Sequence, residues 1–99
     1  MNEVTRHIDQ IRKLCKSNKV RSLFAFGSVL SPDFKPDSDI DLIVDIDAKD
    51  PITYSNSYFN LKFQLEQLFM REIDLLEQGT VKNPYLRKQI DETKVLIYG

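Results

Sequence analysis

The pattern of hydrophobic and polar positions divides the chain into alternating helices and strands. Apolar residues recur every three or four positions in two segments, which predicts helices over Asn2 to Ser17 and Thr53 to Met70. Asn83-Pro84 is typical of a cap and first helical position, which predicts a third helix from Asn83 to Glu92. Alternating or continuous apolar runs predict strands at Ser22 to Phe26, Asp39 to Ile46, Glu72 to Glu77 and Lys94 to Tyr98. A short helical turn is expected after the first strand, beginning at Gly27-Ser28.

The order of these elements predicts an α/β (α+β) protein with a mixed, mainly four-stranded sheet flanked by helices. The loop Asp33 to Ser38, in which Pro36 fixes the backbone, is expected to bring Ser28 back near Asp39. A chain of 99 residues can form one hydrophobic core. We therefore expect residues 1–99 to be a single domain.

Composition and charge narrow the class of protein. The hydrophobic fraction of 41% and the charged fraction of 29% are typical of globular proteins, and no apolar run approaches the length of a membrane span. A net charge of −1 gives no general electrostatic attraction to a polyanion, so we expect no direct binding to nucleic acid. The N-terminus lacks a signal-peptide core, and the single cysteine, Cys15, cannot form an internal disulfide. These features predict a cytoplasmic protein.

The second predicted strand carries the first candidate chemistry. Its apolar residues alternate with acids, so we expect one buried face and an opposite face that carries Asp39 and Asp41. The Cα atoms of these two acids would lie roughly 7 Å apart, from a rise of about 3.3 Å per residue, so one cation could bind both. Mg²⁺ is usually held by one or two carboxylates together with substrate phosphates. Asp74 is a third acid that points away from an apolar strand.

The Gly27-Ser28 turn ends the first predicted strand, where a backbone N–H and a hydroxyl can point at an anion. Carboxylate-held metal beside such a turn suits an in-line phosphoryl displacement, in which Asp74 could accept the proton of the attacking hydroxyl. Asp45 and Asp47 share the strand face but lie too far along it to bind the same ion, and we expect them to be solvated.

Other side chains are interpreted as structural. His7 is expected on the surface of the first helix, and Cys15 is expected in the core as a small apolar residue. The aromatic stripe with Tyr54 and Tyr58 on the long helix is first a core surface, with nucleobase stacking as the alternative.

The chain combines a strand, a Gly-Ser turn, a D-x-D strand and a later strand acid. This combination resembles the pattern of the nucleotidyltransferase superfamily typified by DNA polymerase beta. Ser38 to Val44, S-D-I-D-L-I-V, resembles more narrowly the minimal nucleotidyltransferase (MNT) domains, and the likeness covers nearly the whole chain. It implies the nucleotidyltransferase fold, with Gly27, Ser28 and Ser38 binding the nucleotide. It also implies that one or two Mg²⁺ ions are coordinated by Asp39, Asp41 and Asp74, the last as metal ligand or base.

The same resemblance implies transfer of a nucleoside monophosphate, AMP from ATP, to a hydroxyl group. Small MNT proteins are similar to antitoxins that pair with a HEPN-domain ribonuclease toxin and neutralise it by adenylylating a tyrosine. A HEPN-domain protein is therefore the expected partner, in a homo- or hetero-oligomer. Two alternatives stay open: an MNT-fold antitoxin that acts by binding alone, and a small-molecule transferase of the aminoglycoside type.

One departure from the family pattern bears on these alternatives. Many MNT domains follow Gly-Ser with a segment that contains an arginine, whereas Val29 to Pro32 contains no basic residue. Lys35 or Lys82 could supply the missing charge.

Overall fold

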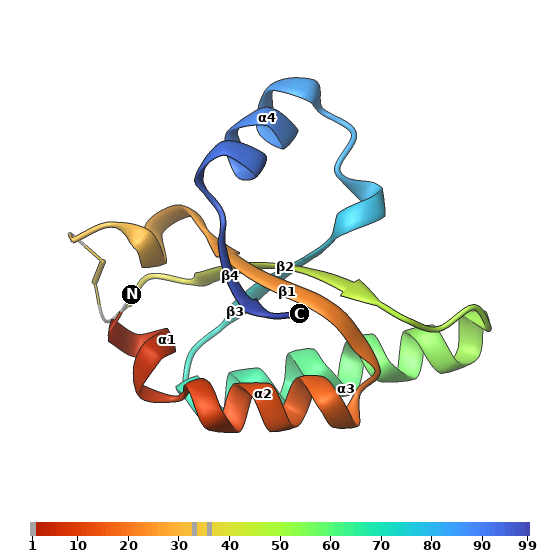
Figure 1. Cartoon of the computed structure of the whole chain (residues 1–99). Helices are drawn as coiled ribbons and strands as arrows, with labels where there is room; N and C mark the ends of the chain where they lie inside the picture. Colours follow the sequence, from red (N-terminus) through yellow and green to blue (C-terminus); the bar gives the residue numbers. More distant parts are fainter. Residues whose placement is uncertain (1, 33, 36) are drawn as a thin grey trace.

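The computed structural model describes residues 2–32, 34–35 and 37–99 (Figure 1). Its four strands form one sheet in the order β3-β2-β1-β4. The strands are β1 (Val20–Phe26), β2 (Ile40–Ile46), β3 (Ile73–Glu77) and β4 (Val95–Tyr98). β1 is antiparallel to β2 and β4, whereas β2 and β3 are parallel. The mixed four-stranded sheet predicted from the sequence is therefore confirmed.

Helices cover both faces of this sheet (Figure 1). One face is covered by α1 (Asn2–Arg6), α2 (Ile8–Ser17) and α3 (Pro51–Phe69). The other face is covered by α4 (Pro84–Thr93). Two short 3-10 turns follow strands, η1 (Gly27–Leu30) after β1 and η2 (Gln78–Thr80) after β3. Within the described part of the chain, no helix is both long enough and apolar enough to cross a bilayer.

α3 and α4 begin where the sequence supplies caps. The Asp50 side chain accepts a hydrogen bond from the Thr53 N–H at 2.9 Å, and Pro51 starts α3. Asn83 and Pro84 start α4 in the same way. α3 ends at Met70, which adopts the left-handed conformation with φ 55°. The observed bounds differ from the predicted ones only at the ends.

Two local predictions need correction, and a third is tested only in part. The helix predicted over residues 2–17 is interrupted at His7, whose ring packs edge-on against Phe69 with centroids 5.4 Å apart. β2 begins at Ile40, so Asp39 lies in the loop before the strand rather than in it. Asp33 and Pro36 lie outside the described residues, and the predicted loop is tested only in part.

The main core lies between the sheet and the first three helices. β2 contributes the four apolar residues that alternation predicted: Ile40, Leu42, Val44 and Ile46. A smaller cluster, Phe26, Ile43 and Ile90, lies on the opposite face of the sheet beneath α4. The expectation of a single buried face in β2 is therefore wrong, because α4 covers Ile43 and leaves it 4% exposed.

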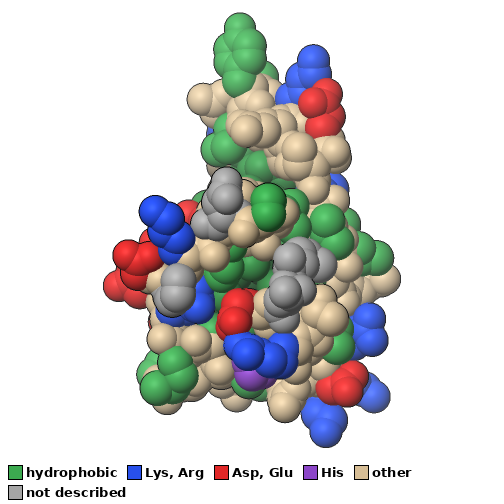
Figure 2. Space-filling view, turned by 90° about the vertical axis from the view of Figure 1, so that its left-hand side faces the viewer, with side chains coloured by type: hydrophobic (Ala, Val, Ile, Leu, Met, Phe, Trp, Pro, Cys, Tyr) green, Lys and Arg blue, Asp and Glu red, His purple; other side chains and the backbone are tan. Residues whose placement is uncertain are grey.

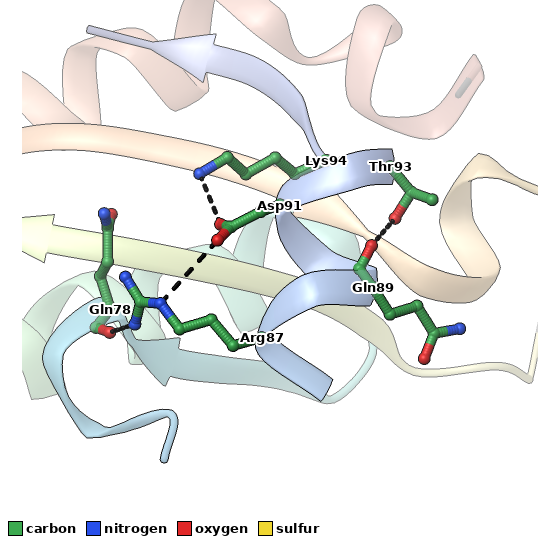
Figure 3. Close-up of polar contacts among 6 residues, drawn as sticks. All are labelled: Gln78, Arg87, Gln89, Asp91, Thr93 and Lys94. Carbon is green, nitrogen blue, oxygen red and sulfur yellow. Dashed lines mark hydrogen bonds and ion pairs between the residues drawn. The ribbon is translucent and has the colours of Figure 1, made fainter. Parts of the chain in front are cut away.

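Polar contacts fix α4 to the rest of the fold (Figure 3). Arg87 donates to the backbone oxygen of Gln78 at 2.8 Å and lies 3.8 Å from Asp91. Lys94 Nζ lies 3.1 Å from Asp91 and 4.4 Å from the centre of the Phe24 ring. These contacts join α4 to η2 and to β1, and they complement the single fully buried side chain of α4, Ile90.

We expect Ile90→Ala to lower the free energy of unfolding by about 2–5 kcal/mol, because it opens a cavity between α4 and the sheet. Chemical denaturation at equilibrium measures this loss. Lys88→Ala on the same helix is the control, since Lys88 is exposed and makes only a 4.0 Å ion pair with Glu92. Equal stability of Ile90→Ala and Lys88→Ala would contradict the role given to Ile90.

Candidate active site

Gly27 connects β1 to η1 and lies against Asp41. Its φ of +74° is in the left-handed region, and a Cβ built on it would lie 2.4 Å from Asp41 Oδ2. The next residue, Ser28, donates its hydroxyl to the backbone oxygen of Asp39 at 3.2 Å and its N–H to the Asp41 carboxylate. The Gly27-Ser28 turn therefore packs directly on the D-x-D segment, as the sequence predicted.

Strand register brings the third acid to the same place. β2 and β3 are parallel, and Asp41 is paired with Asp74. Asp39, one residue before β2, lines a hollow of about 310 Å³ together with Asp74 and Lys62. Figure 2 looks toward the end of the sheet where η1 and the start of β2 lie, and acidic side chains appear there both near the middle of the face and at its left edge. All three predicted acids thus lie at one end of the sheet.

The electrostatics of Asp41 follow from this arrangement. Burial raises the pKa of the half-buried Asp41 carboxyl above its ordinary value, and the negative charges of Asp74 and Asp39 raise it further. The N–H of Ser28 acts in the opposite direction. A cation bound beside Asp41 would remove the repulsion between these carboxylates.

The acids fit Mg²⁺ in the manner that this ion usually adopts. Among the residues that the structure describes, no three acidic, histidine or cysteine side chains form a ready-made metal cage. Mg²⁺ rarely requires such a cage, because it keeps waters and takes one or two carboxylates plus substrate phosphates. Asp41 and its neighbours Asp39 and Asp74 offer only oxygen donors, so the donor set fits this ion.

Two basic residues that sequence reasoning missed lie beside the acids. Lys62 of α3 lines the hollow with Asp39 and Asp74, and its Nζ lies 3.6 Å from Glu66. Of the described residues, neither Lys35 nor Lys82 lines this hollow. Helical spacing places Lys62 on a flank of α3, but only the packing of α3 against the sheet brings it to the acids.

The second missed residue is Arg71, which joins α3 to β3. Its guanidinium donates to the backbone oxygens of Ser38 at 3.1 Å and Lys35 at 3.3 Å, and it lies over the Phe34 ring at 4.8 Å. Arg71 therefore holds the loop that carries Ser38 and Asp39. No sequence pattern indicates this contact, because its partners are backbone atoms far away in the chain.

A larger cleft of about 580 Å³ opens on the other side of the Gly27-Ser28 turn, toward α4. Its walls are mainly apolar, and they include Phe26 from β1 and Leu86 and Ile90 from α4. Gln89 also lines this cleft and extends from the side of α4 opposite the Arg87 and Asp91 contacts (Figure 3). This cleft was not predicted, because it depends on how α4 packs.

Asp45 and Asp47, expected to be solvated, both pair with Arg21. The two distances are 3.1 and 2.7 Å, across the β1–β2 pair. These surface ion pairs follow from antiparallel pairing, which sets Val20 of β1 against Ile46 of β2 and so brings Arg21 to these acids. Both acids are thus engaged away from the turn.

Cys15 and the two tyrosines behave as the sequence predicted, whereas His7 is partly buried against Phe69 instead of lying on the surface. Cys15 is fully buried, and burial raises the pKa of its thiol to about 12, so it is not a nucleophile. Tyr54 and Tyr58 are partly buried against the main core, and the Tyr58 hydroxyl donates to the backbone oxygen of Leu75. Burial also raises the pKa of both phenols.

Comparison with known proteins agrees with this geometry. The sequence profile of the family described as "Polymerase beta, Nucleotidyltransferase" matches residues 9–99, and the chain belongs to this family of nucleotidyltransferase enzymes. Two relatives from Methanocaldococcus jannaschii carry the name "Putative protein adenylyltransferase". They are 29% and 31% identical to this chain over 98 residues, and each alignment covers 98% of this chain and 97% of the relative.

Solved structures show the same fold. A solved structure described as "Structure of putative minimal nucleotidyltransferase" has a TM-score of 0.75 at 24% identity, with 93% of this chain and 90% of that chain covered. A chain of a toxin–antitoxin complex with AMP-PNP has a TM-score of 0.71 at 23% identity, with 93% and 73% covered. A complex of a tri-AMPylated Shewanella oneidensis HEPN toxin with an MNT antitoxin gives 0.66 at 22% identity, with 96% and 71% covered.

We expect Gly27→Ala to destabilise the turn and weaken nucleotide binding. The left-handed backbone alone costs about 1–2 kcal/mol for a residue with a Cβ, and the added methyl collides with Asp41. Thermal unfolding with and without Mg-ATP measures both effects. Gly79→Ala is the matched control, because a Cβ there meets nothing within 4 Å. The close approach of Gly27 to Asp41 would be unimportant if the two variants behaved alike.

Asp41→Asn is expected to raise the midpoint of thermal unfolding at pH 7 without metal or nucleotide. Folded Asp41 holds its proton more tightly than unfolded Asp41, so the native state loses stability as the pH rises through the raised pKa. The gain should shrink as the pH falls through the raised pKa and should vanish below the ordinary aspartate pKa of about 3.9, where wild-type Asp41 is neutral in both states. Asp9→Asn on α2 should give no such gain, and a lower midpoint for Asp41→Asn would contradict the electrostatic account.

Proposed function

We propose that this protein, as a single minimal nucleotidyltransferase domain over residues 1–99, transfers AMP from ATP to a hydroxyl group of a partner protein in a Mg²⁺-dependent reaction. The observation that carries the proposal is the parallel pairing that sets Asp41 beside Asp74, next to the Gly27-Ser28 turn. Relatives named as protein adenylyltransferases support AMP as the transferred group and a protein as its acceptor.

Each part of the site has a proposed role. The Gly27-Ser28 turn and Ser38 bind the triphosphate through N–H and hydroxyl donors. Mg²⁺ is held by Asp39, Asp41 and Asp74, and when bound it offsets the negative charge of the phosphates. Lys62 lines the same hollow, and it supplies positive charge that the segment after Ser28 lacks.

In the proposed reaction, the acceptor oxygen forms a bond to the α-phosphorus of ATP, and the bond from that phosphorus to the pyrophosphate oxygen breaks. Asp74 takes the hydroxyl proton. This role suits Asp74, because its side chain is exposed and lines the hollow that Lys62 of α3 also lines, whereas Asp41 is half-buried. The acceptor then approaches from this hollow, and the nucleoside lies in the apolar cleft beside α4.

The partner that we propose is a HEPN-domain toxin, with AMP transfer as the means of neutralising it. The structural likeness to a complex of a tri-AMPylated HEPN toxin with an MNT antitoxin supports this choice. The reduced thiol of Cys15 is compatible with action of the pair in the cytoplasm.

One observation favours a second function, an antitoxin that acts by binding alone. After Gly27-Ser28, η1 continues with Val29, which is buried, and Leu30, which is partly buried. This part of η1 therefore presents no cation to a triphosphate. Without enough positive charge, the site would hold nucleotide weakly. In this case the acids would have no part in neutralisation.

We expect a mass gain of one or more AMP groups on the protein that co-purifies with this chain, after incubation with Mg²⁺ and ATP. Intact-mass spectrometry after incubation with ATP, GTP, CTP or UTP in turn identifies the nucleotide. The Asp39→Asn, Asp41→Asn double variant should keep the complex and lose the gain, because it removes two oxygen ligands of the metal.

The matched control is Asp45→Asn, Asp47→Asn, which changes two acids of the same segment that pair with Arg21 away from the site. It should retain transfer. A complex that forms and neutralises its toxin, but gains no mass with any of the four nucleotides, would replace the transferase proposal with the binding function.

A further inference from the structure

α3 is apolar on two opposite faces. One face is buried against the sheet through Leu61, Leu65 and Phe69. The opposite face carries four exposed residues, here termed the α3 stripe: Ile52, 71% exposed; Phe59, 64%; Phe63, 63%; and Met70, 85%. Their spacing of seven, four and seven residues places them along one line of the helix. A helix on the surface of a monomer normally presents polar residues on this side.

Few charges interrupt this outer face. The charged residues of α3 are Lys62 and Glu66, and they pair with each other at 3.6 Å on one flank. The other flank carries uncharged polar residues: Asn56, Asn60 and Gln67. Depletion of charge around aromatic side chains is typical of the core of a protein–protein interface. Exposed apolar patches of this kind mark sites of association.

The stripe is complementary to itself. Ile52 and Met70 lie nine residues on either side of Leu61, and Phe59 and Phe63 lie two residues on either side of it. If a second α3 packs antiparallel about a two-fold axis near Leu61, Phe59 meets Phe63 of the partner subunit and Ile52 meets Met70 of the partner subunit. A surface that matches itself in this way is the requirement for a symmetric dimer.

We propose that the α3 stripe is a homodimer interface, in which two copies of this chain pack their α3 helices antiparallel. A fully buried phenylalanine covers about 150–250 Å², and Phe59 and Phe63 are each only about two-thirds exposed, so together with Ile52 and Met70 the stripe offers roughly 500 Å² per copy. The pair would then bury about 1,000 Å², at the lower limit for a specific interface. The dimer is therefore weak and depends on protein concentration.

The proposed dimer buries a different surface from the Gly27-Ser28 cleft. The stripe lies on the side of α3 that faces away from the sheet, whereas this cleft lies on the α4 side of the sheet. The hollow from which the acceptor is proposed to approach is lined by Lys62 and Glu66, so it lies on the flank of the stripe.

Sedimentation equilibrium of the purified chain, up to about 100 μM, tests the proposal. We expect a monomer–dimer equilibrium in the wild type. The dissociation constant of the dimer should be at least about tenfold higher in Phe59→Glu, because a charge would be buried in the pair. Circular dichroism should show Phe59→Glu folded, since Phe59 is largely exposed in the single chain. Tyr85→Glu is the matched control, because it places the same charge on α4 at a residue 85% exposed, and it should dimerise as the wild type does.

Disulfide trapping tests the antiparallel register. A mixture of Ile52→Cys chains with Met70→Cys chains should form mixed disulfide dimers under mild oxidation, and neither variant alone should do so. Cys15 is fully buried and does not compete. Disulfide bonds between two Ile52→Cys chains would indicate parallel helices and overturn the proposed arrangement.

Other results would also overturn the proposal. A wild-type chain that stays monomeric, or a dimer that persists in Phe59→Glu, excludes the stripe as the self-association surface. Loss of the dimer in Leu96→Glu but not in Phe59→Glu would place it at the exposed edge strand β4 instead. A monomer whose binding to a different protein is lost in Phe59→Glu would assign the stripe to that protein.

Discussion

Repulsion between neighbouring carboxylates is the constraint around which this end of the molecule is built. Parallel pairing of β2 and β3 holds Asp41 beside Asp74, and burial makes the negative charge of Asp41 more costly. The stabilisation that tolerates this arrangement comes from the apolar core on the opposite face of the same strands. The core thus supplies rigidity to a site that, without a bound cation, opposes folding locally.

The two faces of the sheet have different roles. One face is covered by α1, α2 and α3 and contains most of the buried side chains. The other bears the acids at one end and a small apolar cluster under α4. Because odd and even residues of a strand point to opposite faces, a single segment such as Ile40–Ile46 can serve the core and the site together.

The sequence allowed prediction of whatever depends on neighbours in the chain. The D-x-D alternation, the Gly-Ser turn and the helix start at Asn83-Pro84 are local patterns with local physical causes. Burial of Ile43 was not predictable, because alternation shows which residues share a face but not what covers it. The contacts of Arg71 and the α4 cleft were missed for the same reason, since they form only when distant segments pack.

The attachment of α4 has a consequence for motion. Ile90 is its one fully buried residue, and the rest of its anchorage is polar and partly open to solvent, through Arg87, Asp91 and Lys94. Segments held in this way open at lower free energy than the strands of a main core. Backbone amides of α4 should therefore exchange their hydrogens with water well before those of β2. The wall of the cleft beside Gly27 can thus loosen while the acids on β2 stay fixed, so that one side of the site adapts and the other does not.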